Sequence, residues 1–130
     1  MPVRVRLIHE AVTDLERYAA SGNLPLFLKK LIHLEAAGRD AGIPLGRGLT
    51  GWRTIVASDR NWRIIFTTDP EETVATVWVI GDGEDAQCYA EAQQRVEALG
   101  ASQPQAASLA AVLFRLQQSQ RAARKTKRRR

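Results

Sequence analysis

Two arginines and a tyrosine have the side chains with the clearest chemical use in this sequence. Arg53 and Arg63 lie in neighbouring runs of strand-forming residues, and Tyr89 lies in a later helical pattern. A guanidinium group pairs with two phosphate oxygens and stays charged at physiological pH. A phenol transfers a proton once nearby cations lower its pKa from about 10, and its ring otherwise stacks on a base. A short turn joins the two runs, so we expect both arginines on one face of a sheet.

This set suits cleavage of RNA by its own ribose. Attack of a 2′-hydroxyl on the adjacent phosphate needs a group that takes the proton, a group that protonates the leaving 5′-oxygen, and cations that stabilise the phosphorane. Arg53 and Arg63 would stabilise the charge, and Tyr89 would transfer a proton. A structural alternative stays open: both arginines are solvated residues of the outer sheet face, and Tyr89 completes the apolar face of its helix.

The other reactive side chains favour structural roles. His9 and His33 are the two histidines and lie too far apart in sequence to suggest a metal site, so we expect no metal and no cofactor. Cys88 is the single cysteine, which excludes an internal disulfide and fits the cytoplasm; we expect it to pack as a small apolar group. No apolar run approaches the roughly 20 residues that cross a bilayer, so we expect no membrane contact.

Hydrophobic periodicity predicts the elements that position these residues. The 130 residues, of which 45% are hydrophobic and 25% charged, are typical of one globular domain. The predicted elements are a strand at 3–8, helices at 12–19 and 24–34, a loop at 38–51, strands at 52–57, 62–67 and 73–80, and helices at 85–99 and 109–116. Short joints between the last three strands predict an antiparallel meander.

The predicted fold class is α+β. An N-terminal strand and a helical hairpin pack on an antiparallel sheet in the order β-α-α-β-β-β-α, followed by a C-terminal amphipathic helix and a basic tail. Within the strand at 73–80, alternation predicts one face of Val74, Thr76, Trp78 and Ile80 and another of Ala75, Val77 and Val79, as in a central strand. We divide the chain into a domain at 1–99 and a C-terminal segment at 100–130.

Charge is distributed unevenly between these two parts. Residues 1–97 hold 11 of the 19 basic residues and all 14 acidic ones, a net charge of −3, whereas no Asp or Glu follows Glu97. We expect residues 121–130 to be disordered in isolation. This tail either binds nucleic acid, together with the turn residue Arg60, or only keeps the chain in solution. The tail cations in question are Arg121, Arg124, Lys125, Lys127, Arg128, Arg129 and Arg130.

The stretch from Leu49 to Tyr89 resembles the RelE/ParE toxin superfamily of bacterial toxin–antitoxin systems. It reads LTGWRTIVASDRNWRIIFTTDPEETVATVWVIGDGEDAQCY. Shared features are Leu49 and Gly51 before a strand that carries Arg53, a turn followed by WRIIF, and an apolar strand that ends in Val-Ile-Gly. The resemblance implies a small α+β toxin that an antitoxin neutralises by wrapping its surface.

The resemblance also implies roles for single residues. Arg53 and Arg63 match basic positions of the family's second and third strands, and Tyr89 matches a late tyrosine. Ile55 and Gly83 stand where two further cations are expected, which favours a protein without nuclease activity.

Two functions therefore stay open. The first is a RelE-like toxin that cleaves mRNA on the ribosome without a metal. The alternative is a non-nucleolytic member, either a ParE-like inhibitor of DNA gyrase or a protein-binding regulator. The apolar stripe from Leu109 to Leu116 would dock on the domain, pair with a second copy, or occupy the groove that an antitoxin uses.

Overall fold

The computed structural model describes residues 2–20, 22, 24–44, 52–57, 62–69, 71, 73–82, 85–99 and 106–128. Its elements are β1 (Arg4–Ile8), α1 (His9–Ala20), α2 (Leu24–Ala37), the 3-10 helix η1 (Gly38–Ala41), β2 (Ile43–Pro44), β3 (Trp52–Ala57), β4 (Trp62–Thr68), β5 (Val74–Asp82), α3 (Asp85–Leu99), β6 (Ala106–Ser108) and α4 (Leu109–Arg128). The α+β class and the order of the predicted elements are confirmed. The strands β2 and β6 were not predicted, because two or three residues are too few to show alternation.

All six strands form one sheet, in the order β2-β3-β4-β5-β1-β6. Strands β3, β4 and β5 form the predicted antiparallel meander. The sheet is mixed rather than wholly antiparallel, because β1 pairs parallel to β5, from Arg4 opposite Val74 to Leu7 opposite Val77. This pairing joins residues about 70 positions apart, and no local pattern in the sequence shows it.

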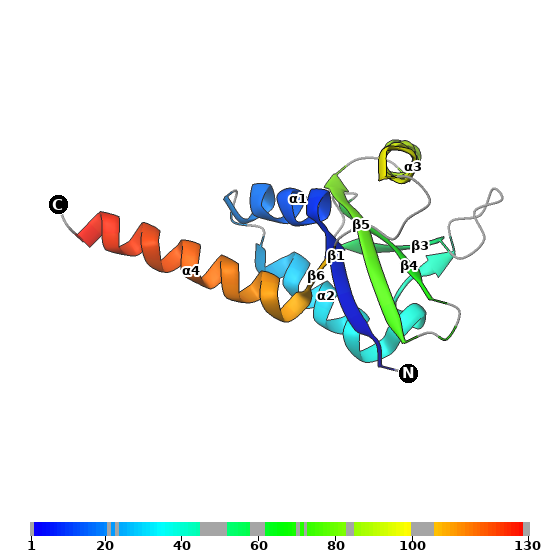
Figure 1. Cartoon of the computed structure of the whole chain (residues 1–130), viewed down its shortest axis with the longest axis horizontal. Helices are drawn as coiled ribbons and strands as arrows, with labels where there is room; N and C mark the ends of the chain where they lie inside the picture. The colour runs from blue at the N-terminus through cyan, green and yellow to red at the C-terminus, as the bar shows by residue number, and fades with distance from the viewer. Residues whose placement is uncertain are drawn as a thin grey trace.

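The main core lies on one face of the sheet, under α1, α2 and the first turns of α4 (Figure 1). At its centre Tyr18, Phe27 and Trp62 form a cluster with ring centroids 4.7–5.1 Å apart. Gly22, between α1 and α2, has a φ of 84°, a backbone conformation that glycine adopts without strain. The helix α3 packs on the opposite face, where Cys88 and Ala92 contact Ile65 and Val79.

A bulge in β5 changes the face of every residue that follows it. Phe66 of β4 pairs with Val77, and the preceding Ile65 pairs with Val79, so that Trp78 is an extra residue. As a result Ile80 joins Ala75 and Val77 in the main core, whereas Val79 packs under α3. The predicted alternation along this strand is therefore wrong beyond Val77, because a bulge inserts one residue into a two-residue period.

Asp69 orders the turn between β4 and β5. Its Oδ1 accepts hydrogen bonds from the backbone N–H groups of Thr73 and Val74 at 2.7 and 2.8 Å, and its Oδ2 accepts one from the Thr73 hydroxyl at 2.6 Å. The Thr73 hydroxyl, followed by the other hydrogen bonds, lowers the pKa of Asp69. These bonds therefore stabilise the turn at neutral pH and are lost only as the pH falls through this lowered pKa.

The helix α4 includes part of the basic tail, and the predicted disorder of residues 121–130 in isolation stays a prediction. The helix α4 begins after Ser108, whose hydroxyl accepts a hydrogen bond from the N–H of Ala111 at 3.2 Å, and it continues to Arg128. Alanine, arginine and lysine are strong helix formers, and they extend a helix whose first turns are already packed. The division at residue 99 stays a prediction, although Leu109, Val112 and Leu116 belong to the main core. Among the described residues, no helix is both long and apolar enough to cross a membrane.

A buried ion pair fixes α3 to the rest of the fold. Arg95 of α3 donates to Asp14 of α1 at 2.7 and 3.1 Å, and also to the Trp78 carbonyl at 2.8 Å. The Asp14 side chain is 3% exposed and also accepts from the Ile80 N–H at 3.1 Å. Burial acts to lower the pKa of Arg95, but the hydrogen bond and charge of Asp14, with Glu91, outweigh it and raise the pKa. Arg95 therefore stays charged and holds α3 in place.

We expect Asp14→Asn to lower the free energy of unfolding by up to about 3–5 kcal/mol, because the guanidinium of Arg95 then keeps only the exposed carboxylate of Glu91 as a counter-charge. Urea unfolding of both proteins measures the change. The control is Arg17→Ala: Arg17 lies 3.6 Å from Asp14 with its side chain 65% exposed, so its loss should cost less than about 1 kcal/mol. Equal stability of Asp14→Asn and the wild type would contradict the role of this pair.

Candidate nucleic-acid interface

Arg53 does not lie on an open surface of the sheet. It is opposite Phe66 in the β3–β4 register and shares the main-core face with it. Its Nε donates to the carbonyl of Arg39 at 2.8 Å, and its Nη2 donates to the carbonyl of Gly42 at 3.0 Å. Arg53 thus binds the segment that leads from η1 into β2. This contact gives the side chain a structural role.

Arg63 lies on the other face. It is opposite Val56 in β3 and Gly81 in β5. Residues directly opposite one another share a face, and alternate residues of a strand share a face. Val56 is three positions from Arg53, an odd number, so the two arginines face opposite sides. The expectation that Arg53 and Arg63 lie on one face is therefore wrong, because a short connection fixes strand direction but not register.

The other predicted site residues have side chains that lie outside the described structure. Tyr89 lies on α3 next to Cys88, on the helix that covers the same sheet face as Arg63, but its side chain is outside the described structure. Arg60 is outside the described residues. The positions from Arg121 to Arg128 lie on α4, again without described side chains, and Arg129 and Arg130 lie beyond them. Cys88 is 2% exposed among apolar side chains, which confirms its predicted packing.

The sheet face opposite α1 and α2 carries a row of polar and aromatic residues, which we name the open sheet face. Arg6 of β1 pairs with Thr76, Thr76 with Thr67, and Thr67 with Trp52. The row crosses four strands and is therefore about 14 Å long. Its side chains are half-buried, whereas Val5 and Leu7 beside Arg6, Ala75 and Val77 beside Thr76, and Phe66 beside Thr67 are buried on the other face. The row places a cation at one end and an indole at the other.

Trp78 completes the aromatic end of the open sheet face. The bulge brings it beside Trp52, with the ring centroids 5.5 Å apart and the rings tilted by 46°. Its indole N–H donates to the Thr67 hydroxyl at 2.9 Å, which fixes the ring. A guanidinium that binds phosphate and aromatic rings that stack bases are the two parts of a binding surface for single-stranded nucleic acid.

Sequence reasoning missed Arg6 and the pairing of Trp52 with Trp78. Alternation of arginines with apolar residues in β1 was the available signal, since Val5 and Leu7 are buried and Arg4 and Arg6 are not. The tryptophan pair depends on the bulge and on register, which leave no sequence signal. Within the described ranges, no group of three His, Cys, Asp or Glu side chains could hold a metal ion.

Comparison with known proteins identifies the fold. No protein-family model matches the sequence, and no curated protein matches it either. A double arginine-to-alanine mutant of the E. coli toxin RelE in the free state matches with a TM-score of 0.59 and 23% identity, covering 74% of this chain and 99% of that one. The toxin–antitoxin complex RelBE2 from Mycobacterium tuberculosis matches with a TM-score of 0.52 and 23% identity, covering 64% of this chain and 100% of that one. The chain therefore has the fold of RelE toxins, as the sequence resemblance implied.

We expect Arg53→Ala to lower the free energy of unfolding by about 1–3 kcal/mol, because two backbone carbonyls lose a charged donor. Urea unfolding measures the change. The matched control is Arg4→Ala, which removes an exposed arginine from β1 and should change stability by less than about 0.5 kcal/mol. If both variants unfold at the same urea concentration as the wild type, Arg53 has no structural role.

Proposed function

We propose that this chain is the toxin of a type II toxin–antitoxin system and that a cognate antitoxin neutralises it. The RelE fold supports this proposal. The extent of the matches supports it too, since they cover 99% of the E. coli RelE chain and 100% of the matched chain of the RelBE2 complex. The second match comes from a complex of a toxin with its antitoxin, which supports a protein partner of that kind.

The toxin would inhibit translation by binding mRNA on the ribosome through the open sheet face. The row from Arg6 to Trp52, with Trp78 beside it, is the observation that carries this proposal. Arg6 would bind a backbone phosphate, and the two indoles would stack on unpaired bases. A surface of this kind favours an unpaired strand over a duplex, because duplex bases offer no free ring faces.

Cleavage would take place beside Arg63, where α3 meets the sheet. The 2′-hydroxyl would lose its proton and attack the adjacent phosphorus, and the 5′-oxygen would leave with a proton, which yields a 2′,3′-cyclic phosphate and a 5′-hydroxyl. Arg63 would stabilise the phosphorane, and Tyr89 would transfer a proton or stack on a base. Arg53 has no part in this site, because it lies on the opposite face and binds two carbonyls.

One observation favours a non-nucleolytic toxin instead. Ile55 stands where the family resemblance implies a lysine, and it is 4% exposed within the main core. It supplies no cation, and it faces away from Arg63. With fewer cations the site would bind RNA without cutting it, or the protein would act on another target such as DNA gyrase.

Induction of the chain in E. coli without an antitoxin should arrest growth, and mapping of mRNA 5′ ends during the arrest should show cuts in phase with the ribosomal A site. Arg63→Ala should reduce these cuts about 100- to 1000-fold, because one donor to the transition state is lost. Arg17→Ala is the control, since it removes an exposed arginine from α1, the helix that packs on the main-core face of the sheet.

Three outcomes distinguish the candidates. Intact mRNA together with stalled DNA replication would support the gyrase inhibitor and contradict cleavage. Cutting that persists in Arg63→Ala at equal protein level would remove Arg63 from the site. Normal growth with abundant folded protein would overturn the toxin proposal itself.

A further inference from the structure

The strand β6 and the helix α4 follow α3 and make up most of the C-terminal segment at 100–130. The match covers 99% of RelE but 74% of this chain, so about a quarter of the chain has no counterpart there. The segment at 100–130 is of that size, and it follows α3, the last of the elements whose order the family resemblance implied. A function of this segment is therefore separate from the shared fold.

The first half of α4 is firmly attached to the body. Leu109, Val112 and Leu116 are 3%, 0% and 8% exposed in the main core. The preceding β6 pairs antiparallel with β1, from Arg6 opposite Ser108 to Ile8 opposite Ala106. The second half therefore extends from a fixed base, and Figure 1 shows it running past the other helices toward the C-terminus.

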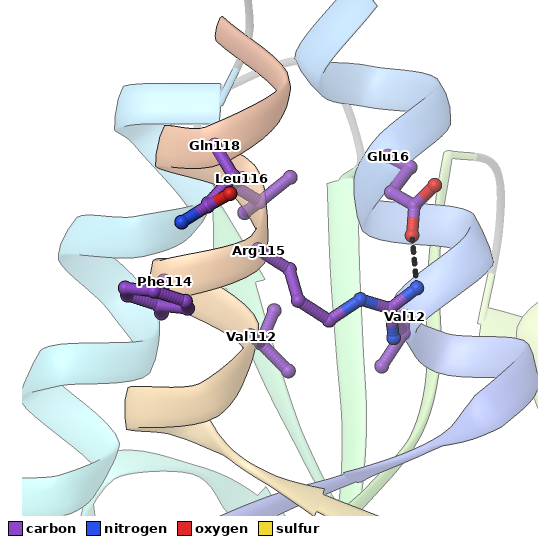
Figure 2. A pocket seen from close by; sticks show the side chains of 7 residues that line it. All are labelled: Val12, Glu16, Val112, Phe114, Arg115, Leu116 and Gln118. Carbon is purple, nitrogen blue, oxygen red and sulfur yellow. Dashed lines mark ion pairs between the residues drawn. The ribbon is translucent and has the colours of Figure 1, made fainter. Parts of the chain in front are cut away.

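A polar contact adds to this attachment. Figure 2 shows Arg115 reaching from α4 across a hollow of about 240 Å³ to Glu16 of α1, with an N–O distance of 3.8 Å. Phe114 of α4, which also lines this hollow, is 61% exposed. The apolar side of the helix thus faces the body, and a different side is free to carry another function.

Four basic positions in the second half of α4 share one helical face, which we name the basic face. Arg121, Arg124, Lys125 and Arg128 have the spacing i, i+3, i+4, i+7, and α4 is helical through all of them. At about 100° per residue they fall within an arc of roughly 100°, centred about 140° away from the buried stripe of Leu109, Val112 and Leu116. Along the axis they span about 10 Å.

The charge distribution makes the basic face the dominant attraction for a polyanion. No Asp or Glu follows Glu97, so the segment offers no internal partner to these cations, whereas residues 1–97 have a net charge of −3. Residues 121–128 also contain no aromatic residue that would stack on a base, and their Arg and Lys side chains pair with phosphate oxygens whatever the sequence. This composition favours contacts with phosphates and disfavours contacts with bases.

We propose that α4 is a nucleic-acid-binding arm whose basic face binds the phosphodiester backbone without sequence preference. The arm is separate from the open sheet face, and the proposal does not depend on whether the chain is a toxin. Four phosphate contacts predict that the logarithm of affinity falls with the logarithm of salt concentration with a slope of about −3.

A rearrangement of charge tests the proposal on the full-length chain. In the variant R121A/A122R/A123R/R124A the composition and net charge are unchanged, but two of the four cations move off the basic face. Binding to a labelled 20-nucleotide mixed-sequence RNA strand, an RNA duplex and a DNA duplex is followed by fluorescence anisotropy between 50 and 200 mM NaCl. We expect this variant to bind at least about tenfold more weakly than the wild type, with the slope reduced by about half.

Two further variants complete the test. R121Q/R124Q/K125Q/R128Q should lose most of the salt-dependent binding to the two duplex probes, whereas K29Q/K30Q, which removes two cations from α2, should bind like the wild type. Circular dichroism and thermal melting confirm that each variant keeps its fold. A preference among the three probes identifies the nucleic acid that the arm serves.

The proposal is overturned if the rearranged variant binds as tightly as the wild type, since charge alone would then suffice. It is also overturned if K29Q/K30Q weakens binding as much, or if the wild type binds none of the probes at 50 mM NaCl. Growth arrest in cells is a separate measurement, so failure of the arm and failure of the toxin proposal give different results.

Discussion

Each side chain on β3, β4 and β5 must face either α1 and α2 or the opposite side, and the first face is fully occupied by the core. This constraint decides which residues can act on another molecule. Arg53 falls on the core side and uses its charge to bind two carbonyls of its own chain. Arg63 falls on the opposite side, and the bulge at Trp78 adds an indole there. Register thus places the two arginines on opposite faces of the sheet, and the inserted residue adds an indole to the face of Arg63.

The same constraint explains how much of the molecule could be predicted. Periodicity and turn residues are local, so they predicted most strands and helices, including the helix α3 with its ends at Asp85 and Leu99. The parallel pairing of β1 with β5 depends on residues far apart in the sequence, and β6 is too short to show a pattern. The tail was predicted to be disordered because it is rich in charge and poor in apolar residues, although its alanines and long basic residues also favour a helix.

The expectation that the two arginines share one face failed for a more specific reason. A match to a family motif assigns a residue to a strand but not to a face. Arg53 and Arg63 both matched basic positions. Val56, the partner of Arg63 in β3, is three positions from Arg53, and an odd number of positions along a strand means opposite faces. Arg6, which the motif did not include, lies on the same side as Arg63. The alternation of Arg6 with its apolar neighbours Val5 and Leu7 is the sequence signal that would have found it.

The ion pair of Asp14 and Arg95 connects the fold to the site. Since β4 and β5 are covered by α1 and α2 on one side, α3 can only pack on the side that carries Arg63 and the tryptophans. Among the described side chains, the buried apolar residues that hold it there are Ile65, Val79, Cys88 and Ala92. A buried charge pair is sensitive to geometry, because each partner is costly when left alone. It therefore fixes the position of α3 more tightly than these apolar contacts would, and with it the helix on which Tyr89 lies.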